Sequence, residues 1–227
     1  MVATGFAWDI IVTNLTKPRS IIFDSKGRLL VVQQQVGIVA LSLSNDSCAA
    51  VTQWHTVLQN KSLTHGLEFS PDGTTLYASS SAQAWSWQYD VENATVSKPK
   101  LLVSGMNNTD HVTRTLHISP LYPNLLIISR GSASNIDMVA ANIKSGHAQV
   151  KVFDLNHVPT GGYDFVADGK VLGWGLRNEV GITSDRFGKI WGVLNAADDV
   201  AFNGTNISKD NPSEELHYRT SHSQSQA

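Results

Sequence analysis

Residues 67–77 read LEFSPDGTTLY, which is an apolar strand, a turn made of Ser, Pro, Asp and Gly, and a second apolar strand. Proline and aspartate favour the turn, and glycine takes the positive φ that closes a hairpin. The pattern recurs as IIFDSKGRL at 21–29, LHISPLYPNL at 116–125 and VGITSDRFGKIW at 180–191. The turn residues Gly27, Gly73, Asn124 and Gly188 lie 46, 51 and 64 residues apart. On average these spacings are slightly wider than the ~40–50 residues of a propeller repeat.

A further β-like stretch follows three of these hairpins, at residues 37–43, 85–89 and 150–155. Each repeat therefore has three or four strands, which is the content of one propeller blade. A small β-sandwich could hold as many strands, but it would not require a repeating turn. The sequence predicts an all-β fold, a partial β-propeller of about four blades over residues 1–218. We expect residues 219–227 to form a disordered polar tail.

Composition narrows the possible functions of the chain. Its 227 residues are 41% hydrophobic and carry a net charge of -2, so no basic excess favours nucleic-acid binding. The longest apolar runs, such as residues 29–32, are strand-sized, so no membrane span is expected. Cys48 is the only cysteine, which excludes an internal disulfide and a cysteine metal cage.

Acceptor sequences for N-glycosylation are frequent in this chain. Seven asparagines are followed by X-Ser/Thr, against about 2.6 expected by chance, which favours a secreted, extracellular glycoprotein. A Ser- and Asn-rich β-protein could also produce such an excess through composition. Residues 1–5 lack the basic start and apolar stretch of a signal peptide, so we expect a removed signal or a start within a longer gene. The seven are Asn14, Asn45, Asn60, Asn93, Asn107, Asn203 and Asn206.

Three segments just before repeated hairpins carry the candidate chemistry: LTHG at 63–66, DHVTRTL at 110–116 and GWGLRNEVG at 173–181. Because each leads into an equivalent hairpin, we expect all three at one end of the propeller. Histidine can accept a proton near neutral pH, and arginine binds anionic oxygens. Nucleophile elbows, Walker loops, His-Glu-X-X-His helices and EF-hand loops are absent. The residues alone predict a basic, histidine-containing mouth.

These segments resemble the fungal pyranose dehydrogenases that use pyrroloquinoline quinone (PQQ), which are related to soluble glucose and sorbosone dehydrogenases. The resemblance runs from about Gly5 to Tyr218, and its strength lies in the shared order and spacing of individually weak motifs. The matching motifs are KPRSIIFD at 17–24, HGL at 65–67, HVTRTL at 111–116, SRGS at 129–132, GLRNEVG at 175–181, IWGV at 190–193 and DNPSEEL at 210–216.

The resemblance implies a six-bladed propeller in which PQQ lies over the central channel on a Ca²⁺ ion. It implies that His111 is the general base for the sugar C1 hydroxyl and that Arg177 and Asn178 contact the quinone. His65 and Arg130 lie in matching segments and are assigned to cofactor binding. Backbone carbonyls near Ala196 and Ala197 would hold the calcium. A sugar substrate, an electron-acceptor protein and secretion are implied in the same way.

Two departures from the family qualify these expectations. Where the glucose enzymes have an aspartate that orients the catalytic histidine, this chain reads SRGS at 129–132, so we cannot assign the orienting acid. The resemblance also stops at Tyr218, before the C-terminal blades, which leaves open whether the truncated chain is active. Two alternatives are a gluconolactonase-like, calcium-dependent hydrolase and a non-catalytic propeller that binds glycans or proteins. The hydrolase would need acidic calcium ligands at the channel, and the nearest is Glu68, just inside the next strand.

Overall fold

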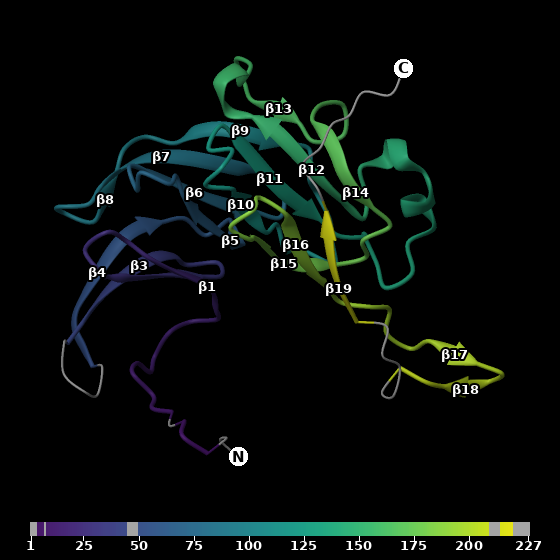
Figure 1. The fold of residues 1–227 in the computed structure, drawn as a ribbon, viewed down its shortest axis with the longest axis horizontal. Coiled ribbons are helices and arrows are strands. Elements are labelled where there is room, and N and C mark those ends of the chain that lie inside the picture. The colour runs from purple at the N-terminus through teal and green to yellow at the C-terminus, as the bar shows by residue number, and fades with distance from the viewer. Residues whose placement is uncertain (1–3, 7, 45–49, 209–213, 220–227) are drawn as a thin grey trace.

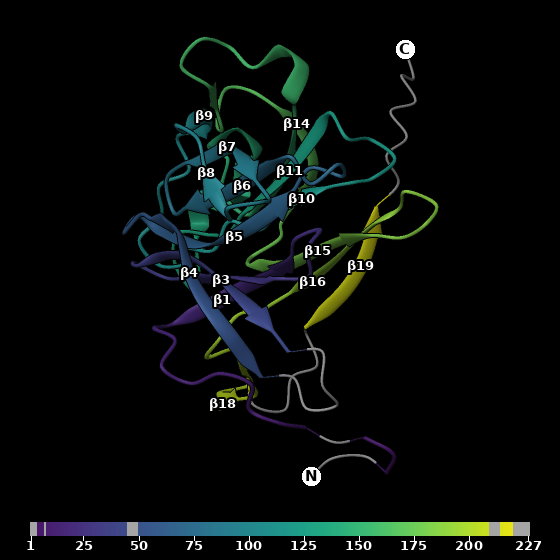
Figure 2. The same ribbon diagram turned by 90° about the vertical axis from the view of Figure 1, so that its left-hand side faces the viewer.

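A computed structural model describes residues 4–6, 8–44, 50–208 and 214–219, and it is almost entirely β-structure (Figures 1 and 2). Blade 1 is a four-stranded sheet in the order β1-β2-β3-β4. Blade 2 contains β5, β6, β7 and β9, with β13 paired to β9 and β8 to β7. Blade 3 has the order β10-β11-β12-β14, and blade 4 the order β15-β16-β19. The predicted all-β propeller of about four blades is confirmed.

The strands have the following bounds. In blade 1 they are β1 (Pro18–Phe23), β2 (Leu29–Gln33), β3 (Gly37–Leu43) and β4 (Val51–Gln59). In blade 2 they are β5 (Leu63–Phe69), β6 (Thr75–Ser80), β7 (Ala84–Asp90), β8 (Thr95–Val96), β9 (Lys100–Ser104) and β13 (Tyr163–Asp164). In blade 3 they are β10 (Leu116–Ile118), β11 (Leu125–Arg130), β12 (Gln149–Asp154) and β14 (Lys170–Trp174). In blade 4 they are β15 (Glu179–Ser184), β16 (Ile190–Leu194) and β19 (Glu215–Arg219).

Smaller elements connect the blades. The short 3₁₀ helices η1 (Met138–Ala141), η2 (Ile143–Ser145) and η3 (Leu155–His157) flank β12. The hairpin of β17 (Ala201–Phe202) and β18 (Thr205–Asn206) lies between β16 and β19 and projects away from the sheets, at the lower right of Figure 1. No described helix is long and apolar enough to cross a membrane.

The repeated hairpin turns follow the predicted chemistry in three of four blades. Gly27, Gly73 and Gly188 have φ values of 75°, 72° and 78°. The prediction of a positive φ at Asn124 is wrong. There the chain makes two consecutive turns, closed by hydrogen bonds from Tyr122 N to the Ser119 carbonyl and from Leu125 N to the Tyr122 carbonyl. Proline is the second residue of both turns, where a negative φ is required, and neither turn needs a left-handed residue.

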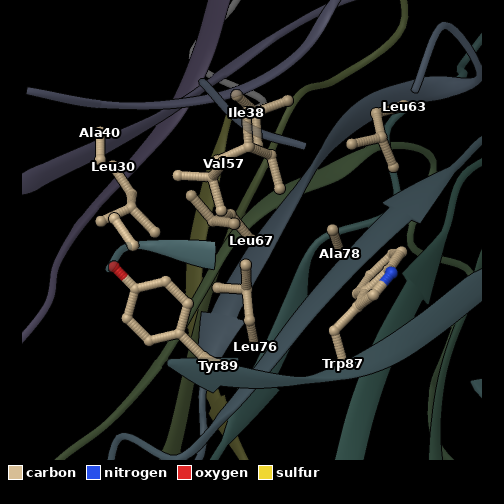
Figure 3. Packing of buried hydrophobic residues seen from close by; sticks show 12 residues of the cluster. Leu30, Ile38, Ala40, Val57, Leu63, Leu67, Leu76, Ala78, Trp87 and Tyr89 are labelled. Atoms are coloured by element: carbon tan, nitrogen blue, oxygen red, sulfur yellow. The ribbon is translucent and has the colours of Figure 1, made fainter. Parts of the chain in front are cut away.

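Two large hydrophobic clusters hold the first three blades together. The first joins blades 1 and 2, where Leu30 and Ile38 of one sheet face Leu76 and Trp87 of the other (Figure 3). The second joins blades 2 and 3 around Met106, Leu126 and Phe153. Apolar side chains from neighbouring blades thus remove each other from water, which is the main stabilising contribution in such repeats. The apolar contact between blades 3 and 4 is smaller. Its buried members are Ile127 and Val150 of blade 3 and Ile190 of blade 4.

Several sequence predictions concern the chain ends and the glycosylation acceptors. Arg219, the first residue of the predicted tail, belongs to β19, where it pairs with Ile190. The rest of the predicted tail, together with Cys48, lies outside the described residues. So does Asn45, whereas five other acceptors are exposed and the sixth, Asn60, is half-buried in a turn. The exposed acceptors are Asn14, Asn93, Asn107, Asn203 and Asn206.

Candidate active site

A pocket of about 250 Å³ opens where the inner strands of the blades begin. Strands β1, β5, β10 and β15 are the first strands of their blades, and all run in the same direction through the molecule. Residues near their starts line this pocket, whereas residues near their ends line a second hollow. The predicted gathering of three loops at one end is therefore observed. The pocket is lined by Arg19, Gln34, Thr64, His65, Asp110, His111, Val112, Thr113 and Asn178.

His111 lies in the loop between blades 2 and 3, and its ring contacts the segment after β11. Its Nδ1 lies 2.9 Å from the backbone carbonyl oxygen of Ser132 and 3.0 Å from the Ser132 hydroxyl. No carboxylate of the described residues forms an ion pair or hydrogen bond with this ring. The orienting acid that the sequence could not supply is thus replaced by a backbone carbonyl.

Arg114 fixes the loop that carries His111. Its side chain is fully buried, and its guanidinium donates to the backbone carbonyls of His111 at 2.8 Å and Met106 at 2.5 Å. Burial, with a smaller contribution from the nearby charge of Arg130, lowers the Arg114 pKa to about 9. An arginine that binds several carbonyls of one loop restricts the loop's backbone, so the backbone position of His111 is fixed.

Arg130 is buried and is not among the residues that line the pocket. Its guanidinium donates to the Asn107 carbonyl at 3.0 Å and lies 5.8 Å from the centre of the Phe165 ring. Burial lowers the pKa of Arg130 as well. Neither Arg114 nor Arg130 forms an ion pair with a carboxylate of the described residues, although the charges of Asp137 and Asp164 act to raise the pKa of Arg130.

His65 lies on β5 against the inner wall of the pocket. Burial is the main cause that lowers the pKa of His65 to about 4, and the positive charge of Arg19 lowers it further. An interaction with the Val180 backbone acts to raise this pKa. Its Nδ1 is buried without a hydrogen-bond partner in the described part of the chain. Arg19 is exposed on β1 and forms no ion pair with the described residues. Our sequence analysis missed Arg19 as a site residue, although it lies within one of the matching motifs.

Asn178 lines the pocket, but the neighbouring Arg177 does not. The Arg177 guanidinium donates to Asn135 Oδ1 at 2.7 Å, to Asp198 at 3.0 Å and to the carbonyl oxygen of Ala196. Ala196 and Ala197, predicted to hold calcium, are not among the residues that line this pocket, and the Arg177 guanidinium binds the Ala196 carbonyl.

The second hollow, of about 470 Å³, lies at the other ends of the inner strands. Glu68 and His117 face each other there, with 3.2 Å between Glu68 Oε2 and His117 Nδ1. Glu68, the acid on which the hydrolase alternative depends, is thus directed away from the mouth. Asp110 is the acidic residue among those that line the mouth pocket.

Comparison with known proteins identifies the family. The family model described as TrAA12-like matches residues 1–227, which is the whole chain. The chain belongs to the TrAA12-like family. A "Pyrroloquinoline quinone-dependent sugar dehydrogenase" from Hypocrea jecorina is 42% identical to it over 223 residues, which make up 95% of this chain and 52% of that protein.

Solved structures agree with this assignment. A Trichoderma reesei structure of carbohydrate-active enzyme family AA12 superposes with a TM-score of 0.90 at 42% identity, covering 96% of this chain and 55% of that chain. The holo form of the PQQ domain of pyranose dehydrogenase from Coprinopsis cinerea superposes with a TM-score of 0.85 at 42% identity, covering 91% and 51%. The chain therefore spans about half the length of the relatives it matches.

Proposed function

We propose that this chain is part of a PQQ-dependent dehydrogenase that oxidises the C1 hydroxyl of pyranose sugars. The observation that carries the proposal is the mouth pocket, where Arg19, His65, His111 and Asn178 meet. The proposal draws further support from the 42% identity to a PQQ-dependent sugar dehydrogenase. The match covers 52% of that relative, so the activity is proposed for a protein of the relative's length.

The residues of the pocket fit PQQ, a planar quinone with three carboxylates. Arg19 has no acidic partner among the described residues and can bind a carboxylate of the cofactor, and His65 lines the same pocket. The Asn178 amide can donate to a quinone oxygen. Arg114 and Arg130, which bind the backbone of the loop that carries His111, add positive charge that attracts an anion. When bound, PQQ accepts the hydride of the sugar.

In this mechanism the chain's own residues bind the substrate and move its proton. The Nε2 atom of His111 accepts the proton of the C1 hydroxyl as the hydride leaves, a general-base role that typically contributes about 10²–10⁴-fold to the rate. Arg114 keeps the loop in place during this step, because it binds the His111 carbonyl. The reduced site would then pass its electrons to an acceptor protein.

Calcium does not fit the predicted carbonyls in their present arrangement. The Arg177 guanidinium binds the Ala196 carbonyl, and its positive charge would repel a divalent cation. The described residues also contain no group of three His, Cys, Asp or Glu side chains that could hold a metal ion. We therefore assign no step to calcium.

Titration with PQQ, followed by the absorbance of the cofactor, tests the proposal in a version of the chain extended to the length of the sugar dehydrogenase relative. We expect uptake of one PQQ per molecule and, with a pyranose and an electron-accepting dye, turnover. Arg19→Met should weaken PQQ uptake, whereas the matched control Arg186→Met, on the exposed turn at the other end of the inner strands, should not. His111→Gln should retain PQQ and lose turnover by about 10²–10⁴-fold.

Other outcomes would favour the alternative functions. Hydrolysis of a lactone without PQQ would indicate the hydrolase, and binding of a glycan without either reaction would indicate a non-catalytic propeller. No PQQ uptake by the version extended to the length of the relative would contradict the dehydrogenase.

We also propose that the protein is secreted and glycosylated, on the basis of its exposed acceptor asparagines. Expression behind a eukaryotic secretion signal should give a product whose mass falls on treatment with an N-glycosidase. An unchanged mass would contradict this proposal.

A further inference from the structure

The side chains of His111 and Asn108 both contact the backbone carbonyl oxygen of Ser132. It lies 2.9 Å from His111 Nδ1 and 2.9 Å from Asn108 Nδ2. The same Asn108 nitrogen also donates to the carbonyl of Gly131 at 2.8 Å. One amide group therefore holds two consecutive carbonyls of the segment after β11, and one of these carbonyls contacts the imidazole.

The surroundings of His111 Nδ1 determine where a neutral ring carries its proton. A carbonyl oxygen can only accept a hydrogen bond, so Nδ1 must be the donor in the contact with Ser132. The Ser132 hydroxyl, 3.0 Å from the same nitrogen, gives its own hydrogen to the Ser134 carbonyl at 2.8 Å and is likewise left as an acceptor. The proton therefore lies on Nδ1, and Nε2 keeps the lone pair that a general base needs.

The amide of Asn108 has a defined orientation because a cation binds its other end. Asn108 Oδ1 accepts a hydrogen bond from the Arg130 guanidinium at 3.4 Å. With the oxygen directed to a cation, the NH₂ group must face the two carbonyls, which fixes which amide atom contacts Ser132. Arg130 is almost completely buried, and this restricts its own position.

We propose that Asn108 is a positioning residue, which holds His111 in the Nδ1–H tautomer through the Ser132 carbonyl. The inference rests on the proposed function, because the tautomer matters for catalysis only if His111 Nε2 is the base. In this chain a neutral amide and a carbonyl orient the histidine where an aspartate was expected. In the sequence, Asn108 lies between the glycosylation acceptor Asn107 and the candidate pair Asp110–His111.

Nitrogen NMR of the histidine rings in the full chain tests the tautomer without cofactor or substrate. We expect the His111 signals, assigned by comparison with His111→Gln, to show a protonated Nδ1 and an unprotonated Nε2 in the neutral form of the ring. A histidine side chain in water prefers the opposite tautomer, with the proton on Nε2. A His111 ring protonated on Nε2 would overturn the proposal, even if the chain proves to be a PQQ enzyme.

The isosteric substitution Asn108→Asp tests the positioning residue itself. It keeps the shape of the side chain but places an acceptor against two carbonyls, so we expect a loss of the Nδ1–H form and, in the PQQ-loaded enzyme, a kcat lower by about 10–100-fold with little change in KM. The exposed Asn156→Ala is the matched control, with unchanged tautomer and kcat. If Asn108→Asp keeps the wild-type tautomer and kcat, Asn108 does not position His111. A correct tautomer without any sugar oxidation would contradict the proposed function and leave the tautomer assignment intact.

Discussion

Blades 2 and 4 support opposite sides of the same mouth, yet they are packed in different ways. Blade 2 contributes to both large clusters, through side chains such as Leu76 and Met106 that are completely buried. Blade 4 has Ile190 and Leu194 in its buried core, while Val193, Leu216 and Tyr218 remain exposed. Blade 4 instead contains a buried charge pair, in which Arg219 binds Glu179 with two hydrogen bonds of 2.8 Å.

This difference separates the two sides of the candidate site. The His111 loop follows the well-packed blade 2 and is held by a buried arginine, so we expect it to be rigid. The segment with Arg177 and Asn178 enters blade 4, which has a small apolar contact with blade 3 and whose own strands β15 and β19 are joined by the Glu179–Arg219 ion pair. Local stability is therefore expected to be high on the side of the proposed base and lower on the side of Asn178.

The largest expected effect comes from the core shared by blades 2 and 3. Phe153 is 2% exposed and packs against the rings of Tyr163 and Phe165. Phe153→Ala should lower the free energy of unfolding by about 3–5 kcal/mol, because it removes buried apolar surface and leaves a cavity. The matched control Phe187→Ala, on a turn of blade 4 where the ring is 68% exposed, should change it by no more than about 0.5 kcal/mol. Equal losses in urea unfolding would show that blade 4 is as well packed as blade 3.

The next effect concerns the ion pair of blade 4. Arg219→Met leaves the Glu179 carboxylate, whose side chain is 1% exposed, without its main partner, and should cost about 3 kcal/mol. Amide hydrogen exchange should accelerate in β15 and β16 but not in blade 2. The double variant Glu179→Met/Arg219→Met removes both charges and should recover most of the loss. An unchanged exchange rate in Arg219→Met would contradict the role assigned to this pair.

A smaller effect follows from the pH dependence of His65. Burial lowers its pKa from 6.5 to about 4, so the unfolded chain binds a proton on this side chain at a higher pH than the folded chain does. The resulting stability is complete above pH 6.5 and is lost as the pH falls toward 4, by about 2–3 kcal/mol. His65→Gln should flatten this part of a plot of unfolding free energy against pH, whereas His55→Gln on the exposed face of β4 should not. A wild-type plot that is level between pH 6.5 and 4 would exclude a buried neutral His65.

The smallest effect is expected for an exposed ion pair between blades 1 and 2. Lys26 contacts Glu92, but their side chains are 44% and 70% exposed. Water and salt screen such a pair, so Lys26→Met should alter the free energy of unfolding by no more than about 0.5 kcal/mol. A loss as large as that of Arg219→Met would mean that burial is not what distinguishes the two pairs.

Much of the fold and part of the site could be predicted from the sequence, because these features depend on local chemistry. The turns at Gly27, Gly73 and Gly188 need a residue that accepts a positive φ, and the repeat of that turn predicts the blades. Since every inner strand starts from an equivalent position, the sequence also predicts that His65, His111 and Asn178 lie at one mouth. Their roles in binding or catalysis remain predictions.

Only the tertiary structure determined how the side chains at this mouth are directed. Arg177 and Asn178 are adjacent in the sequence, yet one guanidinium binds Asn135 and Ala196 while the amide beside it lines the pocket. Likewise, the partner of His111 is a backbone carbonyl, which every residue possesses and which no sequence motif can therefore mark. A repeating turn is encoded by residues that are neighbours in the chain. The direction of a side chain depends on atoms from other blades, which meet only when the chain has folded.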